Sequence, residues 1–176
     1  MSTSNERIVM GIDPGYAILG YAVVVAHGNE LRLLACGVIT TPAGIILPQR
    51  LQQIYERLGA LVNEYHPQEA AMEELFFGRN VTTAIAVGHA RGVAMLALTN
   101  SGIPIAEYKP SEVKLAVTGY GAAKKWQVGE MVRLLLHLGS IPRPDDAADA
   151  AAIAICHLHT ARYQYQYQPL PAGGEK

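Results

Sequence analysis

The segment from Asp145 to about Thr160 constrains the fold most, because its centre is apolar on every side. It opens with acidic residues, which helix N-termini favour, and continues as Ala150-Ala151-Ala152-Ile153-Ala154-Ile155-Cys156. A helix that is hydrophobic all round has to be covered by other elements. We therefore expect a helix over 145–160 that is buried against a β-sheet.

Short apolar runs bounded by turn residues supply that sheet. We expect five strands, at 8–13, 19–25, 32–40, 69–77 and 103–108. Further helices are expected at 47–64, 81–100, 110–117 and 124–138. The first three strands form an antiparallel meander, whereas the fourth follows a crossover helix and can pair parallel to the first. This alternation places the chain in the α/β class.

Length and composition fit one compact domain. The chain has 176 residues, of which 50% are hydrophobic and 16% charged. We take 1–160 as a single domain and the Tyr-Gln-rich 161–176 as a disordered C-terminal tail. No run is apolar enough to span a membrane. A polar N-terminus and two cysteines without metal-ligand spacing indicate a cytoplasmic protein.

Basic residues are concentrated in one part of a nearly neutral chain. The net charge is −1, which argues against coating nucleic acid by overall charge. Between 79 and 143, however, basic residues exceed acidic ones by five. They are Arg79, Arg91, Lys109, Lys114, Lys124, Lys125, Arg133 and Arg143. A local phosphate-binding face is therefore possible, and so are ordinary solvated helix faces.

Acidic residues lie where strands end and where the last helix starts. Asp13 ends the first strand, before a Pro-Gly turn, and could be either a solvated turn residue or part of a site. Glu73 and Glu74 alternate across the fourth strand, so only one of them can meet Asp13. Asp146 and Asp149, three apart, share a helix face. Such carboxylates suit Mg²⁺, and two such ions can drive phosphodiester hydrolysis.

The helix expected over 81–100 is rich in small residues. Gly88 and Gly92 are four apart and lie on one of its faces. Small residues allow another backbone to approach closely. The face therefore packs either on the sheet or against a second copy of the chain.

Several motifs stand out along the chain. They are GIDPG (11–15) followed by Gly20-Tyr21, MEELFFGRN (72–80), AxxxGxARG (84–92), VKLAVTGYGAAKKWQV (113–128) and DDAADAAAIAICHLH (145–159). Taken together, they resemble the motifs of the RuvC-type Holliday junction resolvases. The resemblance covers about 8–159 and implies a ribonuclease-H-like fold, with a mixed five-stranded sheet flanked by helices. It also implies a homodimer that nicks two opposing strands of a four-way DNA junction symmetrically, with Mg²⁺, in recombination and repair.

The resemblance also assigns roles to residues. It implies that two Mg²⁺ ions, for which Mn²⁺ can substitute, are held by Asp13, Glu73, Asp146 and Asp149. Asp145 is the alternative to Asp146 if the motif shifts by one residue. Lys125 would act beside the scissile phosphate. The DNA-binding residues implied are Phe76 (or Phe77), which would stack on an unpaired base, Arg79, Lys114 and Lys124. The RuvA and RuvB branch-migration proteins are the implied partners.

Three other functions compete with this interpretation. A sugar-kinase or actin-like ATPase also has a strand followed by a DxG turn, but it needs two such domains, and 176 residues are too few. Another ribonuclease-H-like nuclease would act on RNA or hybrid substrates. A non-catalytic junction-binding module would not need the acidic residues, because acids repel DNA unless metals neutralise them.

Overall fold

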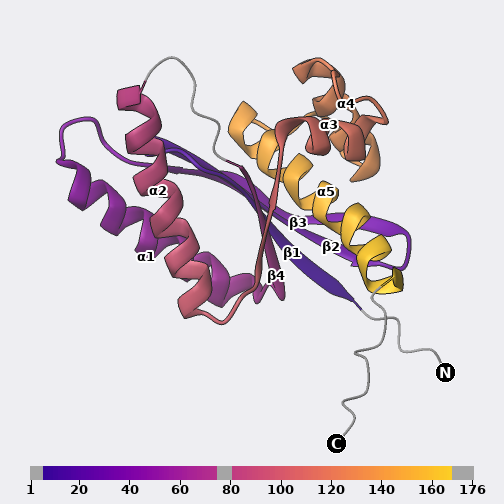
Figure 1. Ribbon diagram of the computed structural model, residues 1–176, viewed down its shortest axis with the longest axis horizontal. Coiled ribbons are helices and arrows are strands. Elements are labelled where there is room, and N and C mark those ends of the chain that lie inside the picture. Colours follow the sequence, from indigo (N-terminus) through magenta and orange to yellow (C-terminus); the bar gives the residue numbers. More distant parts are fainter. Residues whose placement is uncertain (1–5, 75–80, 168–176) are drawn as a thin grey trace, which may run out of the picture.

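The computed structural model describes residues 6–74 and 81–167, which form a mixed α/β arrangement (Figure 1). Phe76, Phe77 and Arg79 lie outside the described residues. The elements in chain order are β1 (Arg7–Asp13), β2 (Ile18–His27), β3 (Glu30–Thr40), α1 (Leu47–Tyr65), β4 (Glu69–Glu73), α2 (Val81–Asn100), β5 (Ile105–Tyr108), α3 (Pro110–Thr118), α4 (Lys125–Leu135) and α5 (Asp145–Tyr167).

The five strands form one sheet in the order β3-β2-β1-β4-β5. β1 pairs antiparallel with β2 and β2 with β3, whereas β4 runs parallel to both β1 and β5. The predicted meander and the parallel fourth strand are therefore confirmed. Because β1 and β4 are parallel neighbours, their carboxyl ends meet at the same edge of the sheet.

Helices cover both faces of the sheet: α1 and α2 lie on one side, and α3, α4 and α5 on the other (Figure 1). Side chains of β1 alternate between the two cores. Met10 and Ile12 pack with Ile54 and Leu58 of α1, while Val9 packs with the apolar centre of α5. The expected burial of that centre is confirmed, because residues 150–156 are almost fully enclosed.

Two glycines let α5 lie unusually close to the sheet. A Cβ on Gly11 would stand 2.1 Å from the carbonyl oxygen of Ala150, and a Cβ on Gly20 would stand 2.1 Å from that of Asp146. Both distances are far below van der Waals contact, so no side chain fits at either position. The backbone of α5 is thus pressed onto β1 and β2, and its first turn is fixed beside the end of β1.

The boundaries and one packing alternative differ from expectation. α5 continues to Tyr167, beyond the expected end near Thr160, since Tyr and Gln do not break a helix. α4 ends at Leu135 instead of Leu138, and His137 adopts a left-handed backbone, with φ of 55°. Gly88 and Gly92 do not pack on the sheet, because a Cβ on either would meet nothing within 4 Å. None of the described helices is long and apolar enough to cross a membrane.

Candidate active site

Two acidic side chains lie at the carboxyl ends of neighbouring parallel strands. Asp13 is the last residue of β1 and Glu73 the last of β4. The residues before them, Ile12 and Met72, pair in register and belong to the core on the α1 and α2 side. Because side chains alternate, Asp13 and Glu73 fall on the α5 side. Of the two glutamates considered, Glu73 is therefore the one that shares a cavity with Asp13.

The start of α5 adds a third carboxylate, that of Asp149. Asp13, Glu73 and Asp149 line one cavity of about 320 Å³. Residues of α3, α4 and α5 complete its wall: Pro110, Val113, Lys114, Lys125, Val128, Ala152 and Ile153. Three elements that are far apart in the sequence thus converge on one acidic pocket with two lysines.

The electrostatics of Asp13 show how crowded this pocket is with negative charge. Burial raises the pKa of the Asp13 carboxyl most, and the charges of Asp149, Glu73 and Asp146 raise it further, to about 7, while Lys125 acts in the opposite direction. An ionised Asp13 is therefore costly at neutral pH unless positive charge is added. Strongly perturbed carboxyls in a cleft are typical of functional sites.

Glu73 shows the same effects more weakly. Its burial and the charge of Asp149 raise the pKa of Glu73, whereas Lys114 lowers it. Lys114 comes from α3, which begins at Pro110 directly after β5. The short β5–α3 connection thus brings a cation to the end of β4.

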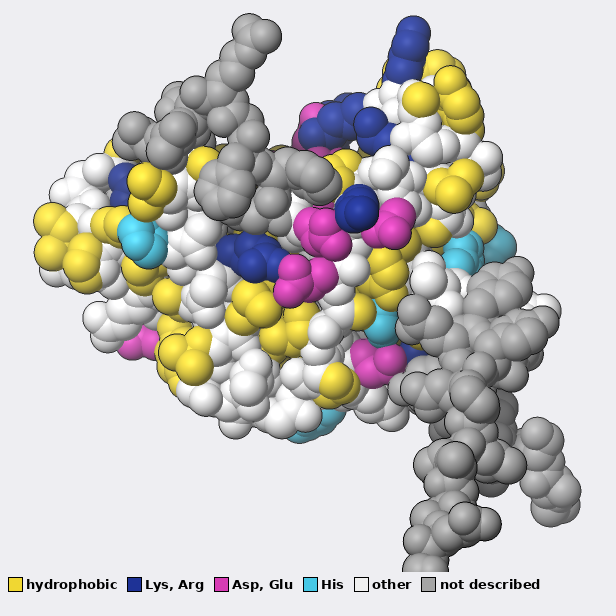
Figure 2. Space-filling model, in the orientation of Figure 1, with side chains coloured by type: hydrophobic (Ala, Val, Ile, Leu, Met, Phe, Trp, Pro, Cys, Tyr) yellow, Lys and Arg dark blue, Asp and Glu magenta, His cyan; other side chains and the backbone are white. Residues whose placement is uncertain are grey.

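Lys125 ties the start of α4 to the start of α5. Its Nζ lies 2.9 Å from Oδ2 of Asp149 and 3.5 Å from Oδ2 of Asp145. The hydrogen bond to Asp149 raises the pKa of Lys125. Arg143 contributes a second cation, with its Nη1 2.6 Å from Oδ1 of Asp145. Figure 2 shows acidic and basic side chains side by side in the middle of this face, between the α1–α2 part and the α3–α4 part.

Two predicted site residues stand apart from the cavity wall. Asp146 lies in the first turn of α5 with its backbone against Gly20. It is not among the described residues that line the cavity, although its charge raises the pKa of Asp13. Lys124 directly precedes α4 and is exposed, and it does not line the cavity either.

The chemistry of the acidic pocket fits a hard divalent cation. Its donors are carboxylate oxygens, and their mutual repulsion would be relieved by positive charge. Within residues 6–74 and 81–167, however, no three His, Cys, Asp or Glu side chains are grouped closely enough to hold a metal. Asp149 is paired with Lys125 instead. A cation held directly by three of these carboxylates therefore requires side-chain movement in the pocket, whereas one or two carboxylates and waters can also hold Mg²⁺.

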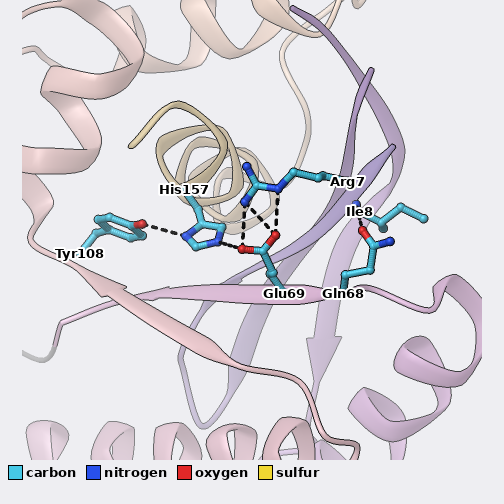
Figure 3. Close-up of polar contacts among 6 residues, drawn as sticks. All are labelled: Arg7, Ile8, Gln68, Glu69, Tyr108 and His157. Carbon is cyan, nitrogen blue, oxygen red and sulfur yellow. Dashed lines mark hydrogen bonds and ion pairs between the residues drawn. The ribbon is translucent and has the colours of Figure 1, made fainter. Parts of the chain in front are cut away.

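A second polar cluster lies at the opposite end of β1 and β4 (Figure 3). The Arg7 guanidinium donates to both carboxylate oxygens of Glu69 over 2.7–2.9 Å. Oε2 of Glu69 lies 2.9 Å from Nε2 of His157, and the Tyr108 hydroxyl lies 2.7 Å from Nδ1. Because an ionised carboxylate can only accept, Nε2–H of neutral His157 donates to Glu69, and Nδ1 accepts from Tyr108.

The pKa values support that assignment. Burial lowers the pKa of His157 by more than Glu69 raises it, so the imidazole is neutral near pH 7. Burial opposes the ionisation of Glu69, but hydrogen bonds from His157 and Arg7 outweigh it and lower the pKa of Glu69. Burial raises the pKa of Tyr108 to about 12. The cluster therefore fastens the middle of α5, at His157, to β1, β4 and β5.

Sequence reasoning did not find this cluster. The visible signals were His157 in an apolar helix and Glu69 at the start of a buried strand. Both are common features of structured proteins, and only the sheet register shows that they meet. The sequence motifs likewise did not reveal that the backbone of α5 fills the space that side chains at Gly11 and Gly20 would take.

Comparisons with known proteins decide the family. The family described as "Crossover junction endodeoxyribonuclease RuvC" matches residues 9–157. The chain belongs to the RuvC family. RuvC of Chloroflexus aggregans is 60% identical over 148 residues, which are 84% of this chain and 90% of that protein. RuvC of Rubrobacter xylanophilus is 52% identical over 157 residues, which are 89% of this chain and 88% of that protein.

Solved RuvC structures agree with the fold. Thermus thermophilus RuvC has a TM-score of 0.84 and 38% identity, and the match covers 89% of this chain and 96% of that one. T. thermophilus RuvC in complex with Holliday junction substrate has a TM-score of 0.86, covering 90% and 96%. The yeast mitochondrial resolvase Ydc2, at a TM-score of 0.63 and 14% identity, shares the fold, with 90% and 82% covered. The predicted ribonuclease-H-like fold is confirmed.

Proposed function

We propose that this RuvC family member is an endodeoxyribonuclease that resolves four-way DNA junctions by paired, symmetric, Mg²⁺-dependent nicks in recombination and repair. The observation that carries the proposal is the acidic pocket, where burial and the charges of Asp149 and Glu73 raise the pKa of Asp13 to about 7. The relatives support the substrate class. They are named crossover junction endodeoxyribonucleases, and T. thermophilus RuvC has been solved with a Holliday junction substrate.

The acidic residues are assigned to the metal. Asp13, Glu73 and Asp149 are the proposed ligands in the cavity, and Asp146 is the proposed fourth, one turn earlier on α5. When bound, Mg²⁺ (or Mn²⁺) lowers the pKa of a coordinated water and stabilises charge on the leaving oxygen, and two ions per site are expected. The shift to about 7 means that Asp13 gives up its proton when positive charge arrives.

The lysines of the pocket are assigned to the phosphate. Lys114 and Lys125 place two ammonium groups in the cavity wall. Lys125 is held by Asp149. If that carboxylate held a cation instead, the ammonium would be free to pair with a phosphate oxygen. Lys124, which is exposed and directly precedes Lys125, is proposed to attract the phosphates of the DNA backbone. Arg79, and Phe76 stacked on an unpaired base, are proposed for the junction centre on resemblance alone.

The outward face of α2 is the proposed dimer surface. Ile85 and Leu96 are each 53% exposed, and Gly88 and Gly92 beside them meet nothing within 4 Å. A second copy could therefore approach this helix closely. A two-fold dimer would match the two-fold symmetry of a four-way junction and would place two acidic pockets on opposing strands. RuvA and RuvB are proposed partners, and the cytoplasm, where bacterial DNA is processed, is the proposed location.

A comparison of substrates tests the proposed function. A synthetic mobile four-way junction, a linear duplex and an RNA–DNA hybrid of the same sequence would be incubated with the protein in Mg²⁺ and in EDTA. We expect paired symmetric nicks in the junction alone, lost in EDTA. Preferential cutting of the hybrid would instead assign the chain to ribonuclease-H-like nucleases of RNA. Junction binding without cutting in Mg²⁺ or Mn²⁺ would make it a binding module.

A further inference from the structure

A second hollow, of about 380 Å³, adjoins the acidic pocket. Lys125, Val128 and Asp149 line both, so the two hollows are direct neighbours. The other lining residues come from α4, the loop before α5 and the start of α5: Trp126, Gly129, Ile141, Arg143, Asp145 and Ala148. Trp126 and Gly129, three apart on α4, face this hollow together, while Lys125 and Val128 separate it from the acidic pocket. Nothing in the proposed cleavage step uses it.

Trp126 makes this hollow unusual. It is the chain's single tryptophan, yet 64% of it is exposed. Gly129 allows Ile141 to lie against α4, since a Cβ there would already stand 3.1 Å from Cγ2 of Ile141. An exposed aromatic wall beside an aliphatic contact is suited to a flat ring. A tryptophan side chain that is largely exposed to water is typical of binding surfaces.

Arg143 supplies the charge at this hollow. Its side chain is 76% exposed, and its hydrogen bond to Asp145 uses one of the several N–H donors of the guanidinium. Arginine beside an exposed aromatic binds single-stranded nucleic acid well, because the base stacks on the ring and the phosphate pairs with the guanidinium. Lys125 lines both hollows, so a strand whose phosphate lay beside Lys125 would also reach the second hollow.

We propose that Trp126, Ile141 and Arg143 form a nucleotide subsite, in which one base of the cut strand, next to the scissile phosphate, stacks on Trp126. The inference rests on the proposed nuclease function and adds to it a determinant of how the cut strand is held. The occupant is DNA, because the hollow lies directly beside the acidic pocket and shares Lys125 with it. A stacked base fixes its own phosphate, and the neighbouring phosphate is thereby positioned beside Lys125.

The single tryptophan allows a direct test. The Asp13→Asn variant, which should bind but not cut, would be titrated with a four-way junction while tryptophan emission and DNA anisotropy are recorded on the same samples. Stacking of a base on Trp126 quenches its emission. We expect quenching that saturates together with binding, and that is lost when the nucleotide beside the cut is made abasic. Inorganic polyphosphate, which has no bases, should not quench.

Cleavage provides the second readout. Trp126→Ala should slow junction cleavage by about tenfold, the loss expected when stacking of one base is removed, and Trp126→Phe should restore most of the rate. Tyr120→Ala, at a tyrosine that is 62% exposed and outside the hollow, is the matched control and should cut normally. The abasic substrate should slow the wild type but should not slow Trp126→Ala further.

The outcomes separate this subsite from the nuclease function. Junction binding without quenching, quenching by polyphosphate, or normal cutting by Trp126→Ala would each overturn the subsite and leave the nuclease intact. Normal cutting by Trp126→Ala with loss of binding to a branch-migration protein would reassign the surface to a protein partner. Failure of the wild type to bind or cut junctions would overturn the proposed function itself.

Discussion

The acidic pocket should destabilise the metal-free protein, and Asp13→Asn should reveal this cost. The pKa of Asp13 is raised from 3.8 to about 7, so the folded protein resists ionisation of this carboxyl more than the unfolded chain does. Below the unfolded value both states are protonated, and the cost is absent. It grows as pH rises through this interval and is complete above pH 7, where it reaches about 4 kcal/mol.

Asparagine cannot ionise, so Asp13→Asn removes the pH-dependent cost. The asparagine amide also changes stability through its own packing and hydrogen bonds in the pocket, but that contribution does not change with pH. In EDTA, the free energy of unfolding of the variant relative to wild type should therefore rise by about 2.5 kcal/mol between about pH 5 and about pH 8. With a urea m-value of about 2 kcal/mol/M, this corresponds to a relative midpoint shift of about 1 M.

Urea unfolding followed by circular dichroism measures this difference. Glu30→Gln, at the exposed first residue of β3, is the matched control and should show no pH-dependent gain. Added Mg²⁺ should stabilise the wild type more than the variant, because only the wild type keeps all the proposed ligands. A stability difference between Asp13→Asn and wild type that stays constant over this pH range would refute the reasoning about the crowded pocket.

Three further changes test the supports of the site. Gly20→Ala places a methyl group against the backbone of α5, so it should lower the free energy of unfolding by about 1–3 kcal/mol and slow cleavage. Gly44→Ala is the control, because its methyl group would meet nothing within 4 Å, and it should change neither quantity in the same unfolding and cleavage assays. Tyr108→Phe leaves Nδ1 of the buried histidine without its donor and should cost about 1 kcal/mol in urea unfolding, unlike Tyr120→Phe at the surface. Lys125→Met frees the carboxylate of Asp149, a proposed ligand, so calorimetry without DNA should show tighter Mn²⁺ binding although cleavage falls. Weaker Mn²⁺ binding would contradict the proposed competition between the ammonium and the metal.

Local patterns predicted the elements that build the site. The apolar runs predicted β1 and β4, and their parallel pairing predicted that Asp13 and Glu73 lie at the same edge of the sheet. The apolar centre of α5 predicted its burial, and with it the position of Asp149. These inferences succeeded because periodicity and crossover rules act over short distances along the chain.

Contacts between distant segments were not predictable in the same way. Glu69 and His157 are 88 positions apart, and nothing local to either residue encodes the other. The pairing of Lys125 with Asp149 depends on how the loop before α5 turns, and the exposure of Trp126 depends on what covers α4. The predicted end of α5 near Thr160 was wrong, because a Tyr-Gln repeat is as compatible with a helix as with a coil.

The most direct test of the central claim separates binding from cutting. Wild type and Asp13→Asn would be bound to the same labelled four-way junction in Ca²⁺, the affinity measured by anisotropy, and cleavage then started with Mg²⁺ under single-turnover conditions. We predict similar affinities and paired nicks by the wild type alone, because phosphate contacts hold the junction and the acidic pocket cuts it. Equal cutting by Asp13→Asn, or loss of its binding, would contradict the assignment of the pocket as a metal-dependent nuclease centre.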